Sequence, residues 1–331
     1  MRVIVALGGN ALLRRGEPAD VTTQRDNVAA AVSAIAQLAR THEVVVSHGN
    51  GPQVGLLALQ RETNPGLAPY PLDVLGAESE GMIGYLLEQQ LLNELGDHPV
   101  ATLLTQVVVD ASDPAFTNPS KPIGPIYDLE TATRLAADRG WSIAPDGDHY
   151  RRVVPSPEPR AIVELAALRL LVESGVLVVC VGGGGIPVSV DPESRLHGVE
   201  AVIDKDLAAA LLATELHADA LLMLTDVPNV QADWRTPNAR ALTDMTAAEL
   251  RTMRFAPGSM APKIEAACRF VEQTGRVAAI GALNDATRLL TGELGTRITA
   301  AATATHGSAS PPCSDPERSL RSPGVSTWDL S

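Results

Sequence analysis

Short, continuously apolar segments recur along the chain, and a segment with helical spacing of its apolar residues follows almost every one of them. The apolar segments are residues 3–7, 44–46, 100–104, 176–181, 220–224 and 277–280, and the helical ones are residues 22–40, 51–60, 73–95, 160–173, 204–216 and 262–273. Strands that are apolar on both faces must be covered on both faces, and helical connections join parallel strands. The pattern predicts an α/β fold with a mainly parallel sheet that helices cover on both sides.

Two stretches depart from this alternation. Residues 113–159 contain eight of the 24 prolines, with short strand-like pieces between them, and we expect a small inserted subdomain there. Beyond residue 300 the chain turns to Ser, Pro, Thr and Gly without an apolar period, which is typical of disorder, above all over residues 306–331. The sequence therefore predicts one domain over residues 1–300 that carries the insertion, followed by a disordered tail at residues 301–331.

Composition and charge limit the partners of the chain. Apolar residues make up 45% of its 331 residues, and only ten residues are aromatic, which suits a sheet flanked by helices. The net charge of −13 argues against a nucleic acid or an anionic membrane as the main partner. The N-terminal apolar stretch is too short for a signal peptide, and no run of 18 apolar residues occurs. The three cysteines are far apart and suggest neither disulfides nor a zinc site. We expect a cytoplasmic protein.

Glycine-rich turns directly follow three of the predicted strands, at residues 8–10, 47–52 and 181–187. In an open parallel sheet, ligands bind at the carboxyl ends of the strands, where glycine exposes backbone N–H groups to phosphate oxygens. Any one of these segments could be a tight turn without a ligand, but three together indicate an anion site. Neither G-x-x-x-x-G-K-[ST] nor G-x-G-x-x-G occurs, which disfavours a P-loop enzyme and a typical dinucleotide dehydrogenase.

Lysine is rare in this chain, because 23 of the 26 basic residues are arginine and only Lys121, Lys205 and Lys263 are lysine. Codon bias would account for the rarity, whereas a lysine supplies a compact, mobile point charge that can follow a migrating phosphoryl group. Lys205 lies between Asp204 and Asp206 at the start of a predicted helix. Two unit charges about 4 Å apart attract by about 4 kcal/mol at an effective dielectric of 20, enough for Asp206 to orient a lysine. The alternative is a capped helix with a solvated lysine.

Two further segments are candidates for ligand contacts. Residues 224–230 form either an ordinary Asp–Pro–Asn turn or the rim of a nucleotide site. Lys263 enters a predicted helix in its first turn, from where it could reach nucleotide phosphates. Arg151 and Arg152 are either solvated or, together with Lys121, the positive charge of a lid.

Taken together and in order, eight strings over about residues 1–300 resemble those of the carbamate kinases in the amino-acid-kinase family. They are Gly8-Gly-Asn-Ala-Leu12, Ser47-His-Gly-Asn-Gly-Pro-Gln-Val-Gly55, Lys121-Pro-Ile-Gly-Pro125, Arg151-Arg-Val-Val-Pro-Ser-Pro157, Gly182-Gly-Gly-Gly-Ile-Pro187, Asp204-Lys-Asp206, Leu224-Thr-Asp-Val227 and Gly258-Ser-Met-Ala-Pro-Lys263. One string alone would be weak, whereas the ordered set is specific. The tail after residue 300 has no counterpart in the family pattern.

The resemblance implies a three-layer αβα sandwich with a protruding lid, which acts as a homodimer. It implies reversible phosphoryl transfer between ATP and carbamate, with ADP and carbamoyl phosphate as the other pair. Mg²⁺ would travel with the nucleotide, and no metal ligand from the protein is expected. In the family the reaction often runs toward ATP, at the end of the arginine deiminase route.

The resemblance also implies roles for single residues. The transferring phosphoryl group would be held by Gly8, Gly9 and Asn10. The carbamate end would be formed by Gly49, Asn50, Gly51, Gly183 and Gly184. The nucleotide would be faced by Asp226, Val227, Met260 and Lys263. The catalytic residues would be Lys121 from the lid, Lys205, which neutralises charge in the transition state, and Asp206, which organises the lysines.

Two other functions fit the same strings. One keeps the fold and replaces carbamate by another small carboxylate or a phosphonate, although the Lys-Pro-Ile-Gly string at residues 121–124 favours carbamate. The other is a catalytically inactive nucleotide or metabolite sensor, which the intact lysines and Asp206 argue against.

Overall fold

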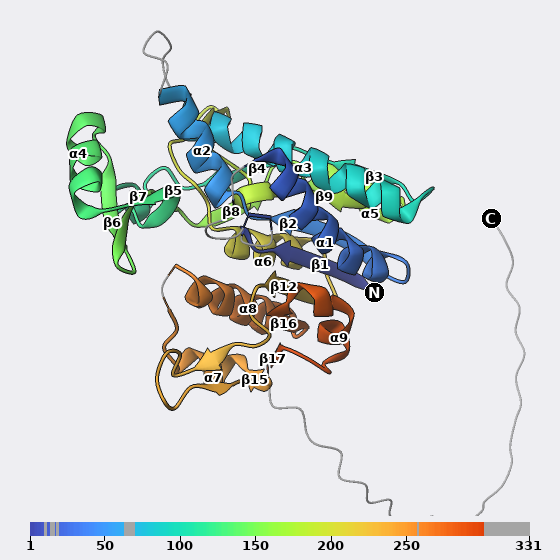
Figure 1. The fold of residues 1–331 in the computed structure, drawn as a ribbon. Helices are drawn as coiled ribbons and strands as arrows, with labels where there is room; N and C mark the ends of the chain where they lie inside the picture. The colour runs from blue at the N-terminus through green and yellow to red at the C-terminus, as the bar shows by residue number, and fades with distance from the viewer. Residues whose placement is uncertain (10–11, 14–16, 18–19, 63–69, 257, 301–331) are drawn as a thin grey trace, which may run out of the picture.

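The structure is a computed structural model that describes residues 1–9, 12–13, 17, 20–62, 70–256 and 258–300 (Figure 1). Within these residues, a sheet of eight strands has the order β15-β17-β16-β12-β1-β2-β9-β3. The strands are β1 (Arg2–Leu7), β2 (Glu43–His48), β3 (Val100–Thr102), β9 (Leu177–Val179), β12 (Ala220–Thr225), β15 (Asp244–Thr246), β16 (Val277–Ala282) and β17 (Thr296–Thr299). Every neighbouring pair is parallel except β16 and β17. The prediction of a mainly parallel sheet is confirmed.

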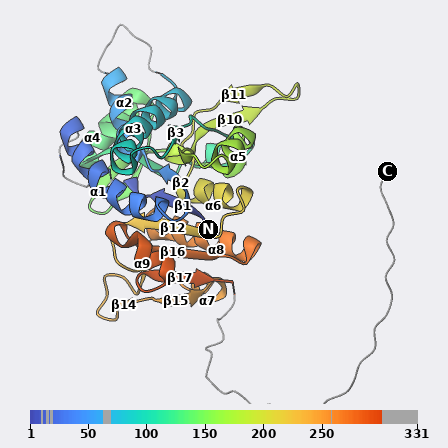
Figure 2. The ribbon, with the colours of Figure 1, turned by 90° about the vertical axis from the view of Figure 1, so that its right-hand side faces the viewer.

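Helices cover both faces of this sheet (Figure 2). One layer contains α1 (Val21–Ala39), α3 (Leu72–Leu95) and α9 (Ala286–Thr291), and the other contains α5 (Leu165–Glu173), α6 (Lys205–Glu215) and α8 (Met260–Thr274). Alternate residues of β1 serve the two layers: Val3 and Val5 pack with α1 and α3, whereas Ile4 and Ala6 pack with α6 and α8. Since both faces are buried, the strand is apolar from Val3 to Leu7.

Residues within the predicted insertion form a small sheet of their own, with the order β5-β7-β6. Its strands are β5 (Lys121–Tyr127), β6 (Ser142–Asp146) and β7 (His149–Val154), and α4 (Leu129–Arg139) lies in the same segment. Figure 1 shows this unit projecting from one side of the main body, and β5 contacts α2 (Gly51–Glu62) at its base. We call β5, α4, β6 and β7 the lid. The boundaries of a separate lid subdomain at residues 113–159 stay a prediction.

A third sheet has the order β11-β10-β4-β8, and β13 pairs with β14. These strands are β4 (Gln106–Val109), β8 (Pro159–Ile162), β10 (Ile186–Val190), β11 (Leu196–Gly198), β13 (Gln231–Ala232) and β14 (Arg240–Ala241), and α7 (Ala247–Arg251) follows β15. The 3₁₀ turns are η2 (Pro114–Phe116), η3 (Gly182–Gly184) and η4 (Leu283–Asp285).

One local prediction is wrong, and one helix was not predicted. Residues 160–173 were expected to be one helix, but β8 occupies their start because Ile162 pairs with Val107 of β4, a contact that local spacing cannot reveal. The insertion contains short strands as expected, together with a helix, α4, that the sequence analysis did not predict. Asp128 caps this helix by accepting a hydrogen bond from Thr131 N, and Gly140 ends it in a left-handed conformation.

Two predictions concern the ends of the chain and the membrane. The predicted tail at residues 301–331 lies outside the described residues. Within the described part, the structure contains no helix long and apolar enough to cross a membrane.

Candidate active site

The carboxyl ends of four adjacent parallel strands meet at one edge of the central sheet. The glycine turns that follow β1, β2 and β9 lie there, and residues 225–227 follow at the end of β12. Two turns are hydrogen-bonded to the end of a neighbouring strand. Gly8 N donates to Leu224 O of β12 at 2.9 Å, and Gly49 N donates to Leu7 O of β1 at 3.0 Å. The sheet topology therefore brings together segments that are more than 200 residues apart in the sequence.

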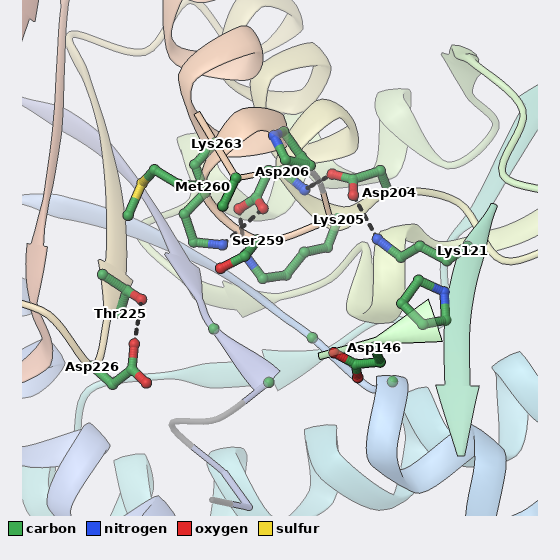
Figure 3. A pocket seen from close by; sticks show the side chains of 18 of the residues that line it. Lys121, Asp146, Asp204, Lys205, Asp206, Thr225, Asp226, Ser259, Met260 and Lys263 are labelled. Carbon is green, nitrogen blue, oxygen red and sulfur yellow. Dashed lines mark hydrogen bonds and ion pairs between the residues drawn. The ribbon is translucent and has the colours of Figure 1, made fainter. Parts of the chain in front are cut away.

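A cavity of about 1120 Å³ opens at this edge (Figure 3). It is somewhat larger than the roughly 300–1,000 Å³ of a pocket for one small molecule, so it offers room for a nucleotide and a second, small substrate. Most of the predicted site residues line it: Gly8, Gly9, Gly49, Asn50, Gly51, Lys121, Gly183, Lys205, Asp206, Asp226, Val227, Met260 and Lys263. The helices α2, α6 and α8 begin at this cavity, so the positive ends of their dipoles face it.

All three lysines of the chain therefore line one cavity, and carboxylates hold two of them in a buried cluster. Lys205 Nζ lies 2.5 Å from Asp206 Oδ1, and Lys263 Nζ lies 3.0 Å from Asp206 Oδ2. We call Lys205, Asp206 and Lys263 the buried charge cluster. The side chains of Lys205 and Asp206 are only 9% and 5% exposed. Figure 3 shows the two ammonium groups converging on the single carboxylate.

Electrostatics keep this cluster ionised around its carboxylate. Burial alone would raise the pKa of Asp206, but the charges of Lys205 and Lys263 outweigh burial and hold the pKa well below its usual value. Burial lowers the pKa of Lys205 to about 8, although the Asp206 carboxylate opposes this effect. Burial would also lower the pKa of Lys263, but the attraction of Asp206 prevails and raises it. The cluster carries a net charge of +1 when ionised, which favours an anionic ligand.

The third lysine comes from the lid. Lys121 Nζ, on β5, lies 2.5 Å from Asp204 Oδ2, and its side chain is 27% exposed. The other oxygen of Asp204 accepts hydrogen bonds from Asp206 N and Leu207 N, so the residue also caps α6. From the sequence, Asp204 was expected only to cap the helix. Its ion pair with Lys121 of the lid depends on the folded position of β5.

Close packing fixes the turns around the cavity. A Cβ atom at Gly49 would lie 2.8 Å from Gly9 N and 3.3 Å from the Lys205 side chain, so only glycine allows the two turns to approach this closely. Gly183 has a φ of +68°, and a Cβ there would lie 2.0 Å from Asn50 Nδ2. The amide of Asn50 thus packs directly against the Cα of Gly183.

Two predicted residues are not placed at the cavity wall. Gly184 lies behind Gly183 against Ile203 O, and it does not line the cavity. Asn10 lies outside the described residues, so its predicted contact with the phosphoryl group stays a prediction.

Sequence reasoning missed several residues that line the same cavity. Asp146 comes from the lid, Trp234 from the loop after β13 and Phe255 from the loop before α8. Arg151, which had been weighed as lid charge, donates to Gly124 O at 2.6 Å within the lid. Trp234 follows Asp233, which has a φ of +52°, in a loop that no sequence motif distinguishes.

The sequence model of the amino acid kinase family matches residues 1–281. The chain is also 53% identical over 300 residues to the carbamate kinase of Haemophilus influenzae, a match that covers 90% of this chain and 97% of that protein. The chain belongs to the amino acid kinase family, and within it to the carbamate kinases. The resemblance seen in the sequence motifs is therefore confirmed.

Solved structures of this family have the same fold. The carbamate kinase of Giardia lamblia bound to citric acid is 42% identical, with a TM-score of 0.85, and the match covers 90% of this chain and 98% of that one. The same enzyme bound to AMP-PNP gives a TM-score of 0.82 at 42% identity over the same shares of both chains.

Proposed function

We propose that this protein is a carbamate kinase that transfers a phosphoryl group reversibly between ATP and carbamate. The observation that carries the proposal is the convergence of the three lysines with the glycine turns on one cavity. The identity to carbamate kinases over 90% of the chain supports the same conclusion. The family relation makes it an ATP-dependent phosphotransferase, and the acceptor is a carboxyl-type group.

The mechanism that fits this geometry is direct in-line transfer without a covalent enzyme intermediate. Phosphoryl transfer has a loose transition state, so positioning and charge neutralisation supply most of the catalysis. Carbamate already presents an anionic oxygen and needs no general base. Lys205 would neutralise charge on the transferring group, Lys121 would move from Asp204 to the substrate, and Asp206 would hold Lys205 and Lys263 in place.

The remaining roles follow the position of each residue around the cavity. Gly8 and Gly9, with Asn10, would bind the transferring phosphoryl group. Gly49, Asn50, Gly51 and Gly183 would form the carbamate end, with Gly184 supporting it from behind. Asp226, Val227, Met260 and Lys263 would face the nucleotide. Closure of the lid would exclude water and protect labile carbamoyl phosphate from hydrolysis.

Magnesium would reach the site with the nucleotide. No group of three or more His, Cys, Asp or Glu in the described part of the chain could hold a metal ion by itself. Mg²⁺ in kinase sites usually keeps several waters and binds substrate phosphates, so nucleotide phosphates and water would supply most of its oxygen ligands. When bound, the ion would neutralise charge on those phosphates. We further propose that the enzyme is cytoplasmic and homodimeric.

A coupled assay of ATP formation from ADP and carbamoyl phosphate tests the proposal. We expect ATP formation that depends on both substrates and on Mg²⁺. ATP formation only from another acyl phosphate would establish a different acceptor. Nucleotide binding without any transfer would establish a sensor and overturn the proposal.

A further inference from the structure

Three of the four backbone N–H groups of the tetraglycine turn after β9 already have hydrogen-bond acceptors. Gly184 N donates to Val181 O, Gly185 N donates to Gly182 O, and Gly182 N donates to Glu80 Oε1 at 2.8 Å. Among the described residues, Gly183 N has no hydrogen-bond acceptor, and Gly183 is the glycine of this turn that lines the cavity. Among these four glycines, Gly183 is therefore the one whose N–H stays available, and it is also a lining residue of the cavity.

This turn is held in a strained conformation. Val181 has a φ of +52°, which is an outlier for a β-branched residue and persists only where the surroundings impose it. Three buried side chains supply that constraint. Ser47 Oγ donates to Val181 O at 3.0 Å, Thr105 Oγ1 accepts from Val181 N at 3.1 Å, and Glu80 accepts from the next N–H.

Glu80 lies on α3 and is 1% exposed. Its Oε1 bonds Gly182 N, and its Oε2 accepts a longer hydrogen bond of 3.3 Å from Thr105 N. The neighbouring Gly182 has no room for a side chain, since a Cβ there would lie 2.4 Å from His48 Nε2 and 2.8 Å from Glu80 Cγ. Burial raises the pKa of Glu80 to about 8, although the hydrogen bonds from Gly182 N and Thr105 N oppose this effect.

Ser79, the residue before Glu80, holds a second side chain that packs against the same turn. Ser79 is fully buried, donates to Gly76 O and accepts a 2.8 Å hydrogen bond from Asn50 Nδ2. That bond orients the amide of Asn50, which packs on Gly183. Two consecutive residues of α3 thus fix both groups that flank the Gly183 N–H.

We propose that Glu80 is a positioning residue that, supported by Ser79, aims the Gly183 N–H at the anionic acceptor substrate. Neither residue lines the cavity, so they act through the glycine turn and Asn50 rather than on the substrate. This inference rests on the proposed function for the identity of the anion. The family strings did not include α3, and no local sequence pattern separates Glu80 from the other acids of that helix.

The helix itself supplies a matched control. Glu88, also on α3, accepts a 2.8 Å hydrogen bond from Thr102 N, and it does not line the cavity. The experiment compares Glu80→Ala, Glu80→Gln and Glu88→Ala. It measures Tm, the affinity for ADP by calorimetry, and kcat and KM for carbamoyl phosphate.

We expect Glu80→Ala to lower kcat/KM for carbamoyl phosphate by at least about tenfold while changing the Kd for ADP by less than about twofold. Glu80→Gln keeps the Oε1 acceptor for Gly182 N but loses the weaker acceptor for Thr105 N, so its kcat/KM should fall less than that of Glu80→Ala. Glu88→Ala should lower Tm but leave kcat/KM within about twofold. Equal losses for ADP and carbamoyl phosphate, or equal losses in the Glu80 and Glu88 variants, would overturn the proposal, as would a Glu80→Gln variant as impaired as Glu80→Ala.

Thr105→Val provides a second test if Glu80→Ala does not fold. It removes the acceptor for Val181 N at nearly constant volume, and it should lower kcat/KM for carbamoyl phosphate selectively, by about threefold or more. Unchanged kinetics would contradict the proposal. If the wild-type protein forms no ATP, the proposed function fails separately. In that case, comparing the affinities of the wild type and of Glu80→Ala for inorganic phosphate tests the turn alone. Equal affinities overturn the positioning role.

Discussion

The buried charge cluster and the lid-side pair of Lys121 and Asp204 hold their lysines in opposite ways. Asp206 uses both carboxylate oxygens for Lys205 and Lys263, in a setting almost closed to solvent. Lys121 belongs to a projecting sheet and makes its ion pair to an aspartate that two backbone N–H groups already satisfy. Losing the lid contact leaves Asp204 with hydrogen-bond partners, whereas losing Asp206 removes the ion-pair partner of two buried ammonium groups. The buried charge cluster is therefore a fixed set of charges, whereas the charge of Lys121 can move to a substrate.

The largest expected effect comes from Asp206→Asn. Breaking a buried ion pair by removing one partner typically costs about 3–5 kcal/mol of unfolding free energy, because the remaining charge is uncompensated. Turnover should fall by at least about a hundredfold, or about 2.7 kcal/mol, since both lysines lose their orientation. Denaturant unfolding and the coupled assay measure the two effects. The control is Glu193→Gln, which breaks an exposed pair with Arg195 and should cost less than about 1 kcal/mol. Similar losses of stability in both variants would contradict the comparison.

Lys205→Arg keeps the charge of the cluster and changes only its shape. We expect turnover to fall by at least about tenfold, or about 1.4 kcal/mol, because a planar guanidinium cannot replace a compact ammonium group in a space that Gly49 and Asp206 confine. Steady-state kinetics of the folded variant is the measurement. Unchanged turnover would show that Lys205 contributes only its charge and would remove its assigned role.

Lys121→Ala should affect the substrate rather than the fold. We expect kcat/KM for carbamoyl phosphate to fall by about fivefold to tenfold, with unfolding free energy changed by less than about 1 kcal/mol. The Kd for ADP should change by less than about twofold. If ADP binding and carbamoyl phosphate use weaken equally, the lid lysine does not distinguish the two substrates.

The smallest expected effect is the dependence on pH. Because burial lowers the pKa of Lys205 to about 8, its ammonium group loses its proton as pH rises through that value. The kcat/KM of the free enzyme should therefore fall by about fourfold between pH 7 and pH 8.5, through loss of the positive charge. In Lys205→Arg, the kcat/KM of the residual activity should not fall between pH 7 and pH 8.5, because arginine stays charged. If kcat/KM still falls over this range in that variant, the titrating group is not Lys205.

The strands and glycine turns were predictable because their determinants are local. A strand covered on both faces needs a continuous apolar run, and residues 3–7 of β1 and 44–46 of β2 show this directly in the sequence. The turns could be placed at one edge of the sheet because parallel strands end on the same side. The three lysines and Asp206 could be singled out by their rarity and by the short motifs around them.

Other features could not be predicted because their partners are distant in sequence. Glu80 is one of several acids on α3, and only the fold brings it to Gly182. The pairing of Lys121 with Asp204 depends on the position of the lid. β8 likewise forms only where β4 offers it an edge, so periodicity alone predicted a helix there.

The sequence by itself determined the layered α/β architecture, the nest of glycine turns and the choice of lysine at three positions. These features follow from the burial of both sheet faces, the conformational freedom of glycine and the charge chemistry of lysine. Each of these acts over a few neighbouring residues. The tertiary structure alone decided which carboxylate holds each lysine, which N–H of the tetraglycine turn remains available, and which residues of α3 support that turn. Such contacts are selected by how the helices and the lid pack on the sheet, because a hydrogen bond or ion pair requires atoms within about 3 Å of each other, whatever their separation along the chain.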